Sequence, residues 1–201
     1  MSFEFLRPSA EAVARSPMEA QALAAGAQME VRDGWNLAVA YPGAPPAGAA
    51  WVDSSHLCKL EVAGAHQLTF GMASRIDGAW WCPVTRDRTL VIGGARDLAG
   101  DHVEVTTALA ALTIVGPLAR EVFARFCAVD LRPQSMPVGG FRPASVARTP
   151  GYVLREDSDR FLMLFGWALG EYMWTVVADA AESLGGGPVG IDALDREVAR
   201  A

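Results

Sequence analysis

The sequence has 201 residues, of which 51% are hydrophobic, and its 17 basic and 23 acidic side chains give a net charge of −6. This apolar fraction is enough for a packed core and argues against a globally disordered chain. A net acidic chain also lacks the basic face that a general nucleic-acid binder needs. At about 100–200 residues per domain, the length fits one large domain or two small fused modules.

No segment of the sequence has the pattern of a membrane span or a secretory signal. The most apolar stretches, 107–115 and 161–169, are far shorter than the roughly 18 residues of a spanning helix. The first residues lack the basic start and apolar run of a signal peptide. Three cysteines, Cys58, Cys82 and Cys127, form no CxxC pair and have no metal-ligand spacing with the histidines. We therefore expect a cytoplasmic protein with reduced, buried thiols and no metal site.

The first half of the chain predicts one short helix and several strands. Residues 1–15 are expected to form a loose leader. The run Ser-Pro-Met-Glu at 16–19 is a typical helix start, since its serine can cap, its proline suits the first turn and its glutamate completes a capping box. Gly26 is a natural end for this helix. Strands are expected at 35–41, 56–62, 78–84 and 89–92, with an exposed Pro/Gly/Ala loop at 42–48.

Alternation is clearest in the strand at 56–62. Cys58, Leu60 and Val62 share one face, and Lys59 and Glu61 share the other. This pattern is typical of a half-buried strand whose charged face meets solvent.

The second half predicts the order strand–helix–strand–hairpin–helix. Its expected elements are a strand at 110–115, a helix opened by Pro117 and continuing through Phe126, a weak strand at 145–147, a hairpin of 152–155 and 161–165, and a helix at 169–184. This order is a split β-α-β pattern of the ferredoxin-like type. The whole sequence therefore predicts an α+β fold of two fused ferredoxin-like modules. We expect a first α+β module at 16–105, a second module at 106–192 and a tail at 193–201.

Generic catalytic motifs are missing from the sequence. It contains no Gly-x-Ser-x-Gly, no P-loop and no GxGxxG after a strand. The run Asp-Ser-Ser-His at 53–56 holds nucleophile-like residue types, but its spacing does not distinguish a hydrolase site from a polar loop. Asp53 and Ser55 are expected to tie down a turn, and Asp77 to lie in an exposed turn. Arg155, beside the predicted hairpin, is expected to be solvated.

Two motifs resemble a known family. The run Asp-Ser-Ser-His-Leu-Cys-Lys-Leu-Glu-Val at 53–62 is similar to the D-x-S-H-hydrophobic-G-K segment of the folate-binding aminomethyltransferase superfamily, which includes the glycine-cleavage T-protein. The run Leu-Thr-Ile-Val-Gly-Pro-Leu-Ala-Arg-Glu-Val-Phe at 112–123 resembles that family's L-x-hydrophobic-x-G-P-x-A-R-E-V-L. Further stretches follow in the expected order, so the resemblance covers roughly residues 16–192.

Within this superfamily the sequence looks most like the short gamma subunits of heterotetrameric sarcosine oxidases. The resemblance implies larger alpha and beta partner subunits that hold the flavins and NAD, and no flavin or NAD in this chain. It implies a non-catalytic, assembly role in a folate-linked sarcosine or N-methyl-amine oxidase, without nucleic-acid or membrane contact. A chain with such a role can self-associate when isolated.

Departures from the family pattern argue against catalysis in this chain. The nearest match to the T-protein catalytic aspartate, which orients or deprotonates a folate nitrogen, is Asp77. The stretch 148–155 lacks the Gly-Glu whose carboxylate binds the pterin ring, and Cys58 replaces a motif glycine. A site that loses one polar reader of the pterin loses much of its discrimination.

Two interpretations follow from the resemblance. In the first, the chain has no catalytic residue and keeps only a vestigial folate pocket at Asp77, Leu57 and Ile92. The alternative is a stand-alone aminomethyltransferase-like protein that binds tetrahydrofolate in an open pocket beside Asp77.

Overall fold

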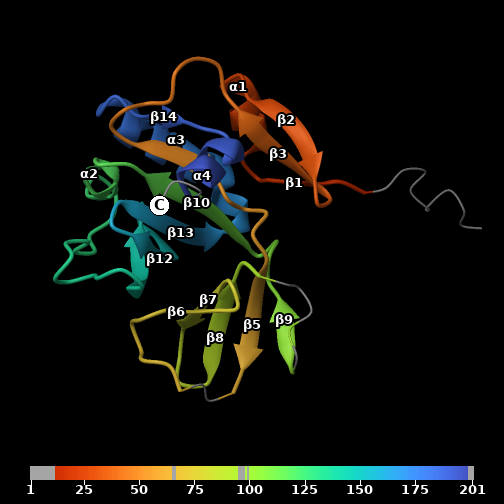
Figure 1. The fold of residues 1–201 in the computed structure, drawn as a ribbon, viewed down its shortest axis with the longest axis vertical. Coiled ribbons are helices and arrows are strands. Elements are labelled where there is room, and N and C mark those ends of the chain that lie inside the picture. Colours follow the sequence, from red (N-terminus) through yellow and green to blue (C-terminus); the bar gives the residue numbers. More distant parts are fainter. Residues whose placement is uncertain (1–11, 65–66, 95–97, 99, 199–201) are drawn as a thin grey trace, which may run out of the picture.

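The computed structural model describes residues 12–64, 67–94, 98 and 100–198, and Figure 1 shows their arrangement in three sheets with a few helices. The three-stranded sheet has the order β1-β3-β2. Its strands are β1 (Ala14–Arg15), β2 (Gln28–Arg32) and β3 (Trp35–Ala40), and α1 (Glu19–Ala24) lies between the first two in the sequence. β2 and β3 form a hairpin around Asp33 and Gly34, whose φ angles are +49° and +77°. Asp-Gly favours this kind of turn, because both residues tolerate positive φ.

The six-stranded sheet is the centre of the molecule and has the order β11-β12-β13-β10-β4-β14. Its strands are β4 (Ala50–Asp53), β10 (Leu109–Val115), β11 (Phe141–Val146), β12 (Thr149–Asp157), β13 (Arg160–Gly166) and β14 (Gly187–Pro188). Its neighbouring strands are antiparallel except for β4 and β14, which are parallel. Both faces of its central strands are buried, so β10 and β13 are apolar almost throughout rather than alternating.

The five-stranded sheet lies at the lower end of the molecule in Figure 1 and has the order β6-β7-β8-β5-β9. Its strands are β5 (Lys59–Ala63), β6 (Ser74–Ile76), β7 (Ala79–Pro83), β8 (Arg88–Ile92) and β9 (His102–Glu104). The remaining elements are α2 (Ala119–Phe123), the 3-10 turn η2 (Trp167–Leu169), α3 (Gly170–Glu182) and α4 (Ile191–Val198).

Alternate residues of the central strands face two different layers. Leu112 of β10 and Phe161 of β13 belong to a core shared with helices α2 and α3. The neighbouring residues Ala111 and Leu162 belong to a second core shared with β7 and β8 of the five-stranded sheet. The six-stranded sheet is therefore sandwiched between helices and a second sheet, as its period-2 side-chain geometry allows.

Most predicted elements are confirmed, with shifts at their ends. The strand near 35–41, the hairpin strands β7 and β8, the strand β10, the hairpin of β12 and β13, and helix α3 all form where the pattern placed them. Helix α1 begins at Glu19 rather than Ser16, because the Ser16 hydroxyl accepts the Met18 amide at 3.1 Å in a turn that precedes the helix. Gly26, with φ +84°, follows its end as expected.

The α+β class is confirmed, and the predicted order of elements in the second half is present. Several strands that the sequence patterns did not predict complete the sheets, among them β2, and β4 beside β10. β4 comes from residues 50–53, so the six-stranded sheet draws on both halves of the chain. The division into modules at residue 105 stays a prediction. Within the described ranges, no helix is long and apolar enough to cross a membrane.

Candidate functional site

The turn between β4 and β5 anchors the two larger sheets to each other. The Ser55 amide donates to Asp53 Oδ1 at 3.0 Å, and the hydroxyls of Ser54 and Thr113 lie 2.7 Å apart. The Ser55 hydroxyl accepts the Ala111 amide at 3.2 Å. Asp53 and Ser55 thus tie down a turn, as predicted, and the two buried serines are engaged with the backbone and side chains of β10.

Lys59 follows this turn and is fully buried, with 0% of its surface exposed. The expectation of a solvent-facing position was wrong for Lys59, because the β4–β5 turn folds over it, whereas Glu61 on the same face is partly exposed. Lys59 Nζ donates to the carbonyls of Ser55 and Leu57, each at 2.9 Å. Burial lowers the pKa of Lys59 to about 8, and the negative charge of Asp53 opposes this shift.

A small cavity of about 10 Å³ lies beside the same turn, and Ser16, Glu19, Asp53 and His56 are among the residues that border it. Burial, together with the charge of Lys59, lowers the pKa of His56 to about 4, and the charge of Asp33 opposes this shift. Burial also raises the pKa of Asp53, against hydrogen bonds from Ser16 and Ser55. A cavity of this size is at the lower limit for one water molecule, which needs roughly 10–15 Å³. The cluster is therefore too closely packed to receive an organic substrate.

The structure brings together two of the three residues assigned to a folate pocket. Leu57 and Ile92 pack into the same hydrophobic cluster between the six-stranded and five-stranded sheets. Asp77 lies in the exposed turn between β6 and β7, with φ +48°. The structure thus brings Leu57 and Ile92 together and leaves Asp77 on the surface, in the turn that its Ile-Asp-Gly sequence predicts.

Aromatic side chains occupy the space around Leu57 and Ile92. The rings of Phe141 and Tyr152 stack with their centroids 5.3 Å apart, and Trp80 packs against the same cluster. The Trp80 indole donates to Glu156 Oε1 at 3.1 Å, while Arg160 Nε donates to Glu156 Oε2 at 2.9 Å. Glu156 therefore joins the two sheets, a role that its position in an acidic turn did not reveal.

Arg155 is buried, contrary to the expectation that it is solvated. Its guanidinium donates to the carbonyls of Met136 at 2.8 Å and Ser158 at 2.6 Å. It also lies 5.4 Å from the ring centroid of Phe161. This arginine holds a loop and a turn together, and its donors are engaged with protein carbonyls rather than directed toward an anionic ligand.

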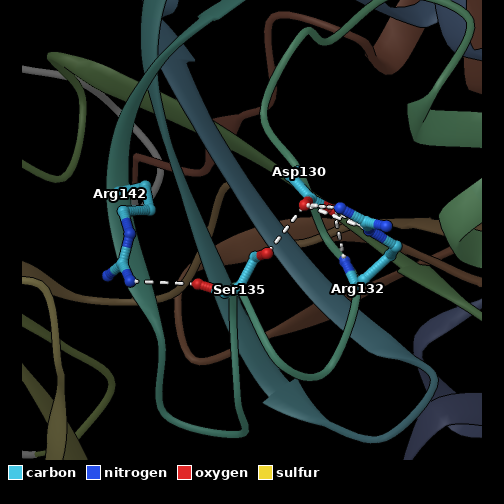
Figure 2. A network of polar contacts seen from close by, with 4 residues as sticks. All are labelled: Asp130, Arg132, Ser135 and Arg142. Atoms are coloured by element: carbon cyan, nitrogen blue, oxygen red, sulfur yellow. Dashed lines mark hydrogen bonds and ion pairs between the residues drawn. The ribbon is translucent and has the colours of Figure 1, made fainter.

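Figure 2 shows the polar network that shapes the loop held by Arg155. The Asp130 carboxylate accepts hydrogen bonds from the Arg132 side chain and from the Ser135 hydroxyl at 2.7 Å. These hydrogen bonds hold the pKa of Asp130 well below its usual range. Arg142 of β11 donates to the Ser135 carbonyl at 3.3 Å. These contacts link Arg132, Asp130, Ser135 and Arg142 in series, so the network stabilises the loop conformation.

The structure also contains a larger cavity, of about 580 Å³, near the edge formed by β4 and β14. It is bordered by segments 39–47, 115–117 and 188–190, together with Ala50, Ala193 and Leu194. The sequence analysis predicted the Pro/Gly/Ala run as an exposed loop but gave no sign that it borders a cavity. Such a concavity requires α4 to lie against β3, a tertiary contact that local sequence does not specify.

The described ranges give little basis for a metal site or for a reactive cysteine. No group of three or more His, Cys, Asp or Glu side chains there lies close enough to hold a metal ion. The three cysteines are buried, and burial raises the pKa values of Cys82 and Cys127. A buried thiol with a raised pKa has little of the thiolate form that acts as a nucleophile.

Comparison with solved structures identifies the fold. No family profile matches the sequence, and a search of curated proteins finds no match. The structure superimposes on a chain of heterotetrameric sarcosine oxidase from Corynebacterium sp. U-96, solved with pyrrole 2-carboxylate, with a TM-score of 0.67 and 15% identity over 86% of this chain and 96% of that chain. It superimposes on glycine cleavage system aminomethyltransferase T from Bartonella henselae with a TM-score of 0.70 and 15% identity over 90% of this chain. The chain has the folate-binding aminomethyltransferase fold.

This aminomethyltransferase fold confirms the resemblance drawn from the motifs at 53–62 and 112–123. The chain spans 61% of the length of the Bartonella aminomethyltransferase and 96% of the sarcosine oxidase chain. A shared fold can carry unrelated activities, so the function is argued from the site itself.

Proposed function

We propose that this chain is a non-catalytic, gamma-type subunit of a folate-linked sarcosine or N-methyl-amine oxidase in the cytoplasm. The observation that carries the proposal is the packing around Leu57 and Ile92. These side chains lie in a cluster with Trp80 and Tyr152, and Asp77 stands apart from it in a surface turn. A folate carrier needs an open cleft with polar readers of the pterin, and this packing does not supply one.

The comparison in length supports the same proposal. The chain covers 96% of a chain from heterotetrameric sarcosine oxidase, a protein whose name states that it has four subunits. We infer that larger partner subunits hold the flavins and NAD and that this chain contributes to their assembly.

The first experiment purifies the tagged chain from its native host. Mass spectrometry should find two larger polypeptides in the eluate, and its visible spectrum should show bound flavin. A colourless eluate containing this chain alone would contradict the proposal. A tagged chain of similar size from the same host, unrelated in fold, controls for nonspecific capture.

The alternative, a stand-alone tetrahydrofolate-binding protein, rests on the fold that the chain shares with the aminomethyltransferase, at a TM-score of 0.70. Calorimetric titration of the purified chain with tetrahydrofolate separates the two functions. The subunit proposal predicts no saturable heat. Saturable binding that Asp77→Ala weakens, while the exposed Asp179→Ala control does not, would favour the alternative.

A further inference from the structure

The cavity of about 580 Å³ beside β14 is bordered by residues without charge. None of its eighteen lining residues is Asp, Glu, Lys, Arg or His, although 20% of the chain is charged. Tyr41 is the one lining residue with a polar side-chain group. Burial raises the pKa of Tyr41, so its hydroxyl stays protonated and neutral over the physiological range. A ligand there meets apolar side chains, backbone groups and one hydroxyl.

The walls of this cavity are fixed by the backbone. Five of the lining residues are prolines, whose φ angle is locked. On one wall the Leu118 amide donates to the Gly48 carbonyl at 2.9 Å, and a Cβ on Gly116 would lie 2.9 Å from that same carbonyl oxygen. On the other wall a Cβ on Gly190 would collide with the Val39 carbonyl group. Both walls therefore need glycine at their closest approach.

Helix α4 is held at the rim of the cavity by an ion pair with the three-stranded sheet. Arg32 of β2 contacts Asp192 of α4 with an N–O distance of 2.5 Å. The Val189 amide donates to the Trp51 carbonyl at 3.0 Å and fixes the segment before the helix. The cavity is thus formed by regular elements and tied loops, which is the arrangement expected of a preformed ligand site.

We propose that this cavity binds a small, uncharged, largely apolar molecule, with the Tyr41 hydroxyl as its one side-chain hydrogen-bonding group. Its volume lies within the range of about 300–1,000 Å³ that small-molecule sites have. Folates, nucleotides and flavin phosphates carry anionic groups, and burying an anion without a cationic partner is unfavourable. The site is therefore distinct in chemistry from the folate pocket that the family resemblance implies, and it does not depend on the proposed function.

A protein partner fits this cavity less well than a small molecule does. Protein interfaces are enriched in large aromatic and aliphatic anchors, and the walls here are mainly Ala, Gly and Pro. The large hydrophobic side chains that the described surface exposes, such as Phe70 at 64% and Val103 at 63%, are not among its lining residues. The concavity is therefore not part of an extended apolar face.

Two fluorescent probes that differ by one charge test the proposal. N-phenyl-1-naphthylamine is uncharged, and 8-anilino-1-naphthalenesulfonate is the same skeleton with a sulfonate. Titration of the full chain should show one saturable site for the uncharged probe, with affinity roughly tenfold higher than for the sulfonate. Equal affinity, tighter binding of the sulfonate or an absence of saturable binding would overturn the proposal.

Variants at Ala47 assign the binding to this cavity. Ala47 is exposed in the Pro/Gly/Ala loop and lines the cavity, so its substitution leaves the core intact. Ala47→Trp should fill the space and Ala47→Glu should place a charge in it, each weakening the uncharged probe roughly tenfold. Ala128→Glu, at another exposed alanine, should bind the uncharged probe as the parent does, and circular dichroism confirms that each variant is folded.

Unchanged affinity for the uncharged probe in both Ala47 variants would overturn the proposal. A second result would also overturn the proposal. If the parent binds no probe, and a polypeptide that co-purifies with the parent is lost from the Ala47 variants, the cavity is a contact with another protein.

Discussion

Lys59 carries an amino group into a part of the protein that water does not reach. Its two hydrogen bonds, to the Ser55 and Leu57 carbonyls, hold the β4–β5 turn against β5. Lys59→Ala removes both donors and leaves a cavity, so we expect the free energy of unfolding to fall by about 2–4 kcal/mol. Urea denaturation monitored by tryptophan fluorescence measures this loss. Arg15→Ala, whose side chain is 74% exposed, should change stability by less than about 0.5 kcal/mol. An equally small change in the free energy of unfolding in Lys59→Ala and Arg15→Ala would show that Lys59 does not stabilise the turn.

His56 makes stability depend on pH in the acidic range. Its pKa is about 4 in the folded chain and close to 6.5 in the unfolded chain. Between these values the unfolded chain binds more protons, so the free energy of unfolding falls as the pH is lowered from 6.5 toward 4. The loss reaches at most roughly 3 kcal/mol. Asp53 acts in the opposite direction near the acidic end, because its raised pKa means that the folded form takes up a proton first.

The contribution of His56 is measured by urea denaturation at about pH 7 and about pH 4.5. The parent chain should lose stability between these conditions, and His56→Gln, which has no proton to bind in this range, should lose less. The same pH dependence in both proteins would assign the effect to other groups.

Burial of single charged residues was the part of the site that local sequence could not predict. Alternation placed Lys59 on the charged face of a half-buried strand, and the position of Arg155 beside a hairpin suggested exposure. Lys59 is covered by the β4–β5 turn that directly precedes it, and Arg155 is covered by the 136–139 loop. Strand alternation carries no information about either covering segment. Asp77 was predicted correctly because a turn of Ile-Asp-Gly is specified by its own three residues.

Glycines at strand positions show how closely β12 and β13 pack. A Cβ on Gly151 of β12 would lie 2.5 Å from the Leu164 carbonyl oxygen and 2.7 Å from a Val146 methyl group. Gly151→Ala therefore forces strand backbones apart and should reduce the free energy of unfolding by about 1–3 kcal/mol. Gly166→Ala, at the end of β13, meets only a Leu169 methyl group at 3.9 Å and should change it by less than about 0.5 kcal/mol. Thermal unfolding of the two variants provides the comparison, and a similar loss in both would rule out the steric explanation.

Arg155 connects strand β12 to the loop shown in Figure 2. Arg155→Met keeps an apolar stem but removes the donors to the Met136 and Ser158 carbonyls. We expect faster amide hydrogen exchange in residues 136–139, because local opening then breaks fewer hydrogen bonds. Arg160→Met, in the same hairpin, should leave this loop unchanged, since Arg160 contacts Glu156 instead. Equal exchange in the parent and in Arg155→Met would contradict the role given to Arg155.

The elements that sequence patterns predicted are those with long apolar signals. β10 and β13 contain seven residues each in nearly continuous apolar runs, and α3 contains 13 residues with apolar side chains at helical spacing. β4 has four residues and β14 has two, too few for any period to be visible. Both exist as strands because they pair at the edge of a sheet that is already formed by β10, so tertiary contact rather than local preference determines them.

At the scale of the whole molecule, the central sheet joins segments that are distant in the sequence. Thr113 pairs with Val52, and Val153 pairs with both Arg142 and Met163. The α+β class and the aminomethyltransferase resemblance were readable from the order of elements and two motifs. The pairing of β4 with β10 could not be predicted from the sequence, because nothing in either strand specifies a partner some sixty residues away. The cavity beside β14 depends on that same pairing, and it was missed for the same reason.

Unfolding of the two larger sheets should be a single cooperative step. Phe141 is 1% exposed and lies in the cluster that β11, β12 and β13 share with β7 and β8. Removing its ring takes contacts from both sheets at once, so Phe141→Ala should lower the free energy of unfolding by about 3–5 kcal/mol without separating the transitions of the two layers. Tryptophan fluorescence, to which Trp80 and Trp81 of β7 contribute, and far-ultraviolet circular dichroism should give coincident urea curves in parent and variant.

The control variant is Phe70→Ala, at a phenylalanine that is 64% exposed, and it should leave the urea midpoint nearly unchanged. Two resolved transitions would mean that the five-stranded sheet unfolds as an independent unit, and the shared cluster would then couple the layers less strongly than its burial indicates.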